Sequence, residues 1–169
     1  TVAALTAMSY LVYEANANSL WPPAAGSEID VASYMSLTDV TFNEAKVALD
    51  AGGTVWDYTL DFDYEDSLYD VHHTVIYLSH EGNDDGSYSG RLTYYVTAGA
   101  MFKCSSETTI NSSLVYSMDT DSILNLEARS AFACGEDKVI IDSDGLVDPT
   151  EDWKDHFTIF TAKFDTESL

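Results

Sequence analysis

An acidic stretch near the C-terminal end of the chain has the spacing closest to a metal site. Aligned on Gly145, it places side-chain oxygens where the third, fifth, ninth and twelfth positions of an EF-hand calcium loop need them. These candidate ligands are Asp142, Asp144, Asp148 and Glu151. The first position, a principal ligand in such loops, is Ile140, and the flanking residues have the pattern of strands rather than helices. Two interpretations follow: a loop stabilised by Ca²⁺, and a hairpin turn with solvated aspartates.

Two adjacent histidines are the next candidates for chemistry. His72 and His73 lie in a segment predicted to be a strand, so they point to opposite faces and cannot bind one metal ion together. Asp70 shares a face with His72, and we expect Asp63 opposite His72 if the connection between the strands has about five or six residues. Acid–base or transition-metal chemistry there would need a third group. An ordinary cross-strand polar pair is the alternative.

Carboxylate rows could serve glycoside hydrolysis, which needs two facing acids, one with a raised pKa. Asp57, Asp61 and Asp63 form one row, and Glu107 and Glu127 lie on the polar side of a hairpin predicted between Cys104 and Cys134. Because the chain has 29 acidic residues, chance pairs are expected, and a solvated sheet face is the simpler explanation. The sequence has no Gly-x-Ser-x-Gly, phosphate-loop or Cys-x-x-Cys motif. We assign no catalytic residue.

Aromatic residues offer a binding surface instead of a catalytic site. Rings at a barrel mouth or on an open sheet face can stack on sugars or hold an apolar ligand. Four lie near expected loops or off the main apolar faces: Trp21, Tyr69, Tyr88 and Tyr95. Packing in the core or at a sheet edge is the alternative for most of the eleven tyrosines and three tryptophans.

Strands must position most of these residues, because from Thr54 onward hydrophobic residues recur with a period of two. Strands are expected at 54–64, 71–80, 87–97, 139–141 and 157–164. A loop is expected at 82–86, and a bulge or corner at 98–100. Helical spacing predicts a helix over residues 3–15. A second helix is predicted over 42–50, because Thr41 and Glu44 have the spacing of a capping box and Gly52 follows as a stop signal.

The two cysteines lie at equal distances from Asp119, which sits in a turn-forming stretch between two strand-like runs. A regular hairpin centred there would bring Cys104 opposite Cys134. It would also pair Ile110 with Ala128, Ser112 with Leu126 and Leu114 with Leu124. This register separates apolar from polar faces. We therefore predict a Cys104–Cys134 disulfide and, since such bonds persist in oxidising compartments, a secreted, periplasmic or cell-surface protein. Two free buried thiols are the alternative.

Charge limits the partners. The chain of 169 residues has 7 basic and 29 acidic residues and a formal charge of −22, which disfavours nucleic acid and anionic membranes. No apolar run reaches the roughly 20 residues of a membrane helix. A cation, a small ligand, a carbohydrate or a protein remains as a partner.

Composition and pattern together predict the fold class. A hydrophobic fraction of 46% supports one folded domain over residues 1–169, with helices and loops in 1–53 and an antiparallel β part in 54–169. We expect a mainly β protein, an antiparallel meander forming a barrel or two-layer sandwich with one or two short helices packed on it. The expected function is non-catalytic binding of a small apolar ligand, a sugar or a protein. The alternatives are a polysaccharide hydrolase or lyase and a calcium-stabilised surface module.

Overall fold

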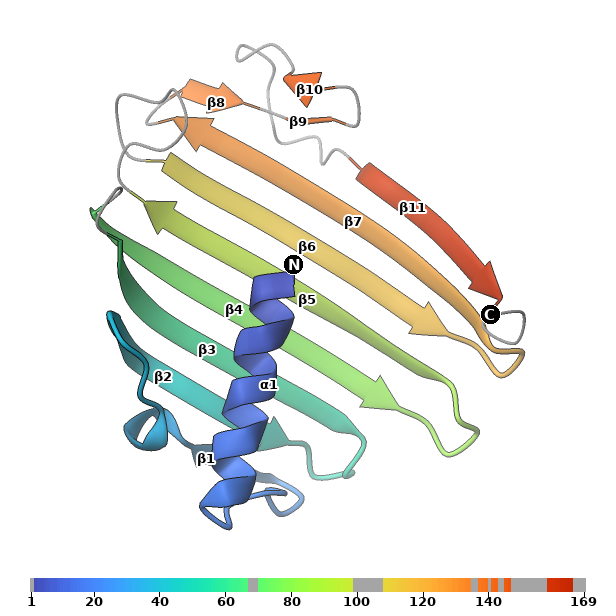
Figure 1. Ribbon diagram of the computed structural model, residues 1–169. Coiled ribbons are helices and arrows are strands. Elements are labelled where there is room, and N and C mark those ends of the chain that lie inside the picture. The colour runs from blue at the N-terminus through green and yellow to red at the C-terminus, as the bar shows by residue number, and fades with distance from the viewer. Residues whose placement is uncertain are drawn as a thin grey trace.

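A computed structural model describes residues 2–66, 70–98, 108–134, 137–139, 141–142, 145–146 and 158–165, and the side chains of 6–65, 72–97 and 109–128. One antiparallel sheet dominates it (Figure 1). The strands follow in the order β1 (Ser27–Asp30), β2 (Val40–Leu49), β3 (Val55–Asp66), β4 (Asp70–Gly82), β5 (Tyr88–Ala98), β6 (Thr108–Met118), β7 (Ile123–Cys134) and β11 (Thr158–Asp165). Short strand β8 (Asp137–Val139) also pairs with β7, while β9 (Ile141–Asp142) pairs with β10 (Gly145–Leu146). The predicted antiparallel meander is confirmed.

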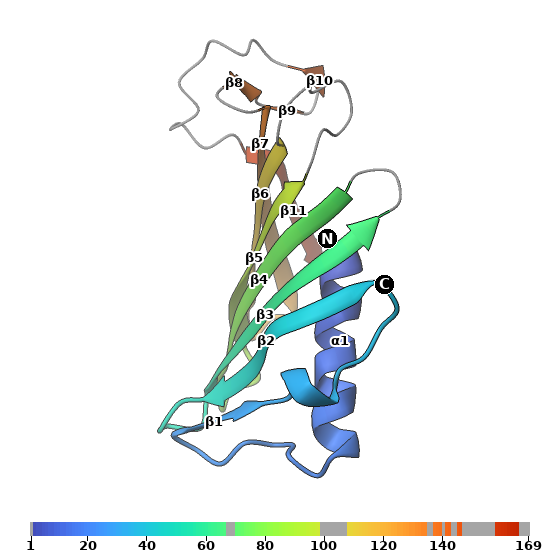
Figure 2. The same ribbon diagram turned by 90° about the vertical axis from the view of Figure 1, so that its left-hand side faces the viewer.

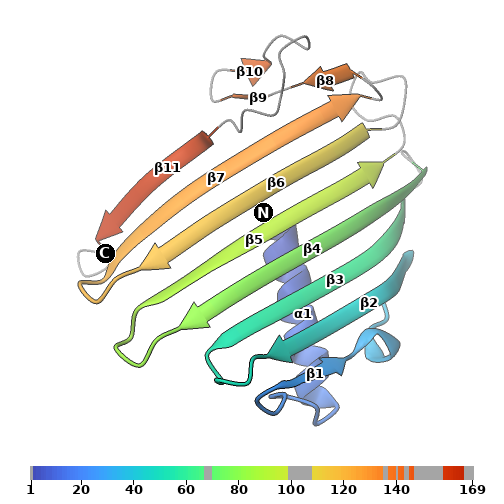
Figure 3. The same ribbon diagram turned by 180° about the vertical axis from the view of Figure 1, so that it is seen from behind.

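The sheet is open. Among the described residues β1 and β11 form its two edges, so the predicted closure into a barrel is wrong. Helix α1 (Val2–Ala17) lies across one face, which we call the inner face, and supplies the second layer that a sandwich would take from another sheet (Figures 1 and 2). Seen from behind, the outer face has no described helix over it (Figure 3). The strands at 54–64, 71–80, 87–97 and 157–164 match β3, β4, β5 and β11.

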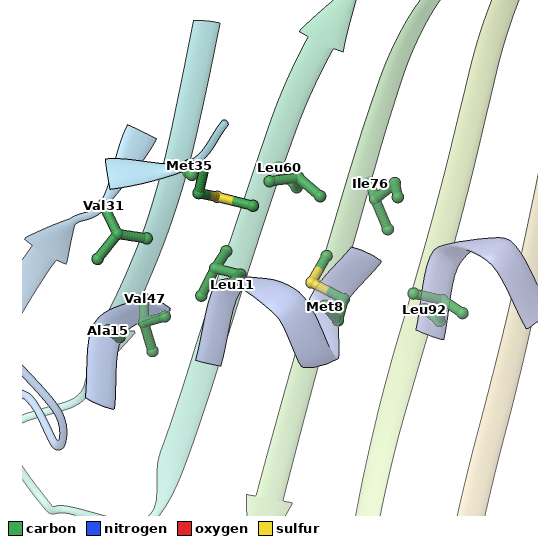
Figure 4. Packing of buried hydrophobic residues seen from close by; sticks show 10 residues of the cluster. Met8, Leu11, Ala15, Val31, Met35, Val47, Leu60, Ile76 and Leu92 are labelled. Carbon is green, nitrogen blue, oxygen red and sulfur yellow. The ribbon is translucent and has the colours of Figure 1, made fainter. Parts of the chain in front are cut away.

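Helix α1 confirms the prediction for residues 3–15. Met8, Leu11 and Ala15 are buried and recur at helical spacing, while Tyr13 on the opposite side is exposed. The buried side packs on inner-face residues of the strands (Figure 4), among them Leu60 of β3, which is completely buried. This contact explains why a helix without charged caps is stable here: burial of its apolar stripe supplies the stabilisation.

The helix predicted over 42–50 is wrong, because this segment is strand β2. Ala45, Val47 and Leu49 are buried, alternate with less buried residues and all lie on the inner face, as a strand with a period of two requires. Pairing with β3 overrides the helix-forming tendency of the alanines and of Glu44. The sheet therefore begins well before residue 54, where we expected only helices and loops. Besides α1, the described part of residues 1–53 contains one 3-10 helix, η1 (Ala32–Tyr34).

The β6–β7 hairpin is confirmed, but its predicted register is wrong. Ile110 pairs with Phe132 instead of Ala128, Ser112 with Ser130 instead of Leu126, and Leu114 with Ala128 instead of Leu124, a shift of four residues (132 − 128). The reason lies in the turn. The carboxylate of Asp119 accepts hydrogen bonds from the backbone N–H groups of Asp121 and Ile123, both at 3.0 Å, so Asp119 begins the turn and is not its centre.

The expected strand at 139–141 is replaced by β8 and β9, two short strands on either side of residue 140, which lies outside the described residues. The expected bulge or corner at 98–100 also falls largely on residues that the structure does not describe.

Candidate functional site

One row of residues crosses the inner face beside α1. In successive strands, Trp56 pairs with His80, His80 with Gly90, and Gly90 with Tyr116. Directly paired residues of an antiparallel sheet share a face, so this row lies on the same side as α1. Together with Trp21, Tyr58 and Tyr88, its ring-bearing members form what we call the inner aromatic cluster: Trp21, Trp56, Tyr58, His80, Tyr88 and Tyr116. Each of these side chains is half-buried.

Gly90 leaves the space in which the Tyr116 ring lies across strand β5. A methyl group at this position would overlap the phenol of Tyr116 and would lie 2.7 Å from the backbone oxygen of Ser79. Because Gly90 has no side chain, the Tyr116 ring lies across β5 and its hydroxyl comes 3.0 Å from Nδ1 of His80. The two rings are stacked, with centroids 6.0 Å apart. A glycine inside a strand thus marks a close approach of a neighbouring side chain.

Tyr88 completes this half of the cluster. Its ring centroid lies 5.7 Å from His80 and 6.2 Å from Tyr116, and the two phenol rings meet edge to face. Such arrangements of aromatic rings are favourable beyond the area that they bury. The three side chains come from β4, β5 and β6, so the cluster depends on correct pairing of three strands.

Tryptophans form the other half of the cluster. Trp21 follows α1 in the chain and stacks on Trp56 of β3, with ring centroids 5.1 Å apart and planes inclined by 25°. It also stacks on Tyr58, at 6.5 Å. Trp21 therefore packs the segment that follows α1 against the sheet. The rings of Trp21, Trp56 and Tyr58 each remain partly accessible to solvent.

The cluster is apolar enough to change the ionisation of its phenols. Burial raises the pKa of Tyr116, and the nearby Tyr58 and Tyr88 hydroxyls raise it further. Burial also raises the pKa of Tyr58 and of Tyr94, another inner-face residue. All three phenols therefore remain neutral at physiological pH and can donate or accept a hydrogen bond.

Formal charge is absent from the part of this face around the cluster. Among the residues of β2–β6 whose side chains are described, the strand register places no Asp, Glu, Lys or Arg on the inner face, while Asp66 and Asp70 lie at the opposite end of β3 and β4. Toward β6 and β7 the face stays apolar but is less covered: Leu92 under α1 is buried, whereas Leu114, Tyr116 and Leu126 are half-buried. Figure 1 shows that β6, β7 and β11 lie beyond the N-terminal end of the helix. An uncharged surface with rings and neutral hydroxyls suits an uncharged ligand.

Most polar candidates lie on the outer face, whereas His72 is buried on the inner face, with its ring centroid 6.0 Å from that of Tyr64. Asp63 pairs with His73 and not with the expected His72. The pairing of β3 with β4 continues to Asp66 and Asp70, so the connection between these strands is shorter than the five or six residues that the expected pairing required. Nδ1 of His73 lies 3.0 Å from the Asp63 carboxylate. Asn43, at a bulge in β2, donates hydrogen bonds to Asp61 and Asp63, both at 3.0 Å.

These hydrogen bonds argue against acid catalysis by Asp63. The amide of Asn43 and then the ring of His73 hold the pKa of Asp63 below its ordinary value, so the group stays ionised. A general acid in glycoside hydrolysis needs the opposite shift. Asp57 is exposed on the same face, as a solvated row predicts. Among the described residues, no group of three or more His, Cys, Asp and Glu could hold a metal ion.

The predicted calcium ligands are tested little by the structure. Asp142 ends β9 and pairs with Gly145 of β10. Asp144, Asp148 and Glu151 lie outside the described residues, as does the side chain of Asp142. The Ca²⁺ loop stays a prediction.

The disulfide also stays a prediction. Thr108, not Cys104, pairs with Cys134, and Cys104 lies outside the described residues. The register on which we based the bridge is therefore wrong, while the bond itself is untested.

The four aromatic candidates lie in different places. Trp21 and Tyr88 belong to the inner aromatic cluster, Tyr95 lies exposed on the outer face, and Tyr69 is outside the described residues. His80 and Tyr116 were missed as site residues. Gly90, isolated within a strand-like run, was the signal that could have revealed the close approach of a neighbouring ring.

Comparisons with protein-family models, with curated proteins and with solved structures find no match for this chain. No helix in the described part of the chain is both long and apolar enough to cross a membrane.

Proposed function

We propose that this protein is a non-catalytic binding module, and that it holds a small, uncharged, largely apolar ligand against the inner aromatic cluster. The observation that carries the proposal is the row Trp56–His80–Gly90–Tyr116, which presents half-buried rings on a part of the inner face where the described side chains carry no formal charge. Ligand sites are commonly apolar and aromatic, with a few polar groups that orient the ligand. Here the hydroxyl of Tyr116 and the ring of His80 supply those groups.

The ligand would extend from the cluster toward β6 and β7. Leu114 and Leu126 continue the apolar surface in that direction, and both keep accessible area in the described structure. Covering such area releases water and is worth about 25 cal/mol per Å² before the costs of binding are subtracted. A neutral ligand also avoids the cost of placing a charge on this surface.

Export to an oxidising compartment remains part of the proposal. It is supported by the presence of two cysteines and by the predicted bridge between Cys104 and Cys134. Intact mass after alkylation without reductant tests it: one disulfide leaves both thiols unlabelled, and two labelled thiols would remove the support.

The ligand proposal can be tested with the neutral fluorescent probe N-phenyl-1-naphthylamine, titrated into the full chain. We expect saturable binding with increased probe fluorescence. Replacing Tyr116 by Leu should weaken it about thirtyfold, since one aromatic contact and one hydrogen bond are each worth about 1 kcal/mol. Tyr95→Leu, on the outer face, is the matched control and should bind as the wild type does. Absence of saturable binding, or equal loss in both variants, would refute the site.

A further inference from the structure

The outer face carries two exposed tyrosines on neighbouring central strands. Tyr77 of β4 is 53% exposed and Tyr95 of β5 is 37% exposed. Tyr77 pairs with Thr93, and Tyr95 pairs with Val75. The two tyrosines are therefore diagonal neighbours on one face, a relation in which backbones lie about 7–8 Å apart and long side chains can serve one ligand.

Polar residues surround this pair. Pairing through β3, β5 and β6 brings Thr59 beside Tyr77 and Asn111 beside Tyr95. The uncharged neighbours on the outer face are Thr59, Ser79, Thr93, Thr97, Asn111 and Ser113, and the charged Asp57, Asp61 and Arg91 lie at positions diagonal to Tyr77. No described helix covers this face (Figure 3). A sugar has apolar ring faces, on which tyrosine rings can stack, and hydroxyl groups at its edges, which can hydrogen-bond to the surrounding hydroxyl and amide groups.

We propose that the outer face binds an uncharged polysaccharide, with Tyr77 and Tyr95 stacking on successive sugar rings and the surrounding hydroxyl and amide groups bonding to its edges. An extended, flat chain of β-1,4-linked hexoses fits the open sheet. The net charge of −22 excludes anionic polymers by repulsion, nucleic acid included.

A protein partner fits this face less well. The centre of a protein interface is a contiguous, desolvated apolar area with aromatic anchors in packed pockets. Around Tyr77 and Tyr95 only Val75 extends the apolar surface, and the other adjacent positions are polar. The inference is independent of the proposed inner-face ligand, because the two surfaces lie on opposite sides of the sheet.

Affinity electrophoresis of the full chain in native gels containing hydroxyethylcellulose, an uncharged β-1,4-glucan derivative, tests the proposal. We expect concentration-dependent retardation of the wild type. The double variant Tyr77→Thr with Tyr95→Thr keeps strand-forming residues and should bind about tenfold more weakly, because each ring contact contributes about 0.5–1.5 kcal/mol.

The control variant is Tyr13→Ala, which removes a tyrosine that is 65% exposed on α1 and should be retarded as the wild type is. Circular dichroism spectra and melting curves establish that all variants are folded. No retardation of the wild type overturns the proposal, as does equal retardation of the double variant or retardation only by carboxymethylcellulose. None of these results bears on probe binding at the inner aromatic cluster.

Discussion

Replacing Gly90 by Ala probes the geometry of the inner aromatic cluster directly. The added methyl group would overlap the phenol of Tyr116 and approach the backbone oxygen of Ser79 to 2.7 Å. The Tyr116 side chain must therefore rotate away, which breaks its 3.0 Å contact with His80 and opens the stack.

The expected cost follows from these contacts. Overpacking by one methyl group costs about 1–3 kcal/mol, and loss of the hydrogen bond to His80 adds about 1 kcal/mol. We therefore expect Gly90→Ala to lower the free energy of unfolding by roughly 2–4 kcal/mol. The contact with the Ser79 oxygen involves backbone atoms and would persist in any variant of Tyr116.

A double-mutant cycle with Tyr116→Ala isolates the overlap. Once the ring is absent, Gly90→Ala should cost at least about 1 kcal/mol less than it does in the wild type, because only the Ser79 contact remains. Urea unfolding of the four proteins, followed by circular dichroism, gives the coupling free energy. Additive effects of the two substitutions would show that Tyr116 does not lie over Gly90 and would refute the geometry of the cluster.

Three further predictions concern the core and the ionisable groups. Leu11→Ala, at a completely buried position, should cost about 2–5 kcal/mol, whereas Leu37→Ala, at a position 51% exposed, should change the urea midpoint little. In a spectrophotometric pH titration, Tyr116→Phe should remove one phenol from the fraction that ionises above about pH 10, because burial raises its pKa. Folding lowers the pKa of Asp63, so the stabilisation that its carboxylate contributes is present above about pH 4 and is lost as the pH falls through the folded pKa. The Asp63→Asn variant should therefore lose less unfolding free energy than the wild type between about pH 7 and about pH 3. Equal losses in the two proteins would contradict the hydrogen-bond network around Asp63.

Much of the sheet could be predicted from the sequence, because alternation of apolar and acidic residues marks a strand with one covered face. In β3, for example, Leu60 is buried under α1 while its neighbours Thr59 and Asp61 face outward. The same reasoning failed for β2, where good helix formers such as Ala45 occupy strand positions, and pairing with β3 decided the outcome.

The register of the β6–β7 hairpin could not be deduced from hydrophobic pattern. A shift by an even number of residues keeps every side chain on the same face, so the predicted and observed registers separate apolar from polar residues equally well. Hydrogen bonds to the carboxylate of Asp119 distinguish them. The inner aromatic cluster was hidden for a similar reason, because the approach of Tyr116 to His80 across Gly90 appears only when three strands are paired.

The most direct test of the binding proposal is an NMR titration of the protein, with ring-labelled tyrosines, by the neutral probe N-phenyl-1-naphthylamine. We predict saturable shifts of the Tyr58, Tyr88 and Tyr116 resonances and no change at Tyr77 and Tyr95 on the opposite face. Shifts confined to the outer-face tyrosines, or no shifts at saturating probe, would contradict the assignment of the ligand site to the inner aromatic cluster.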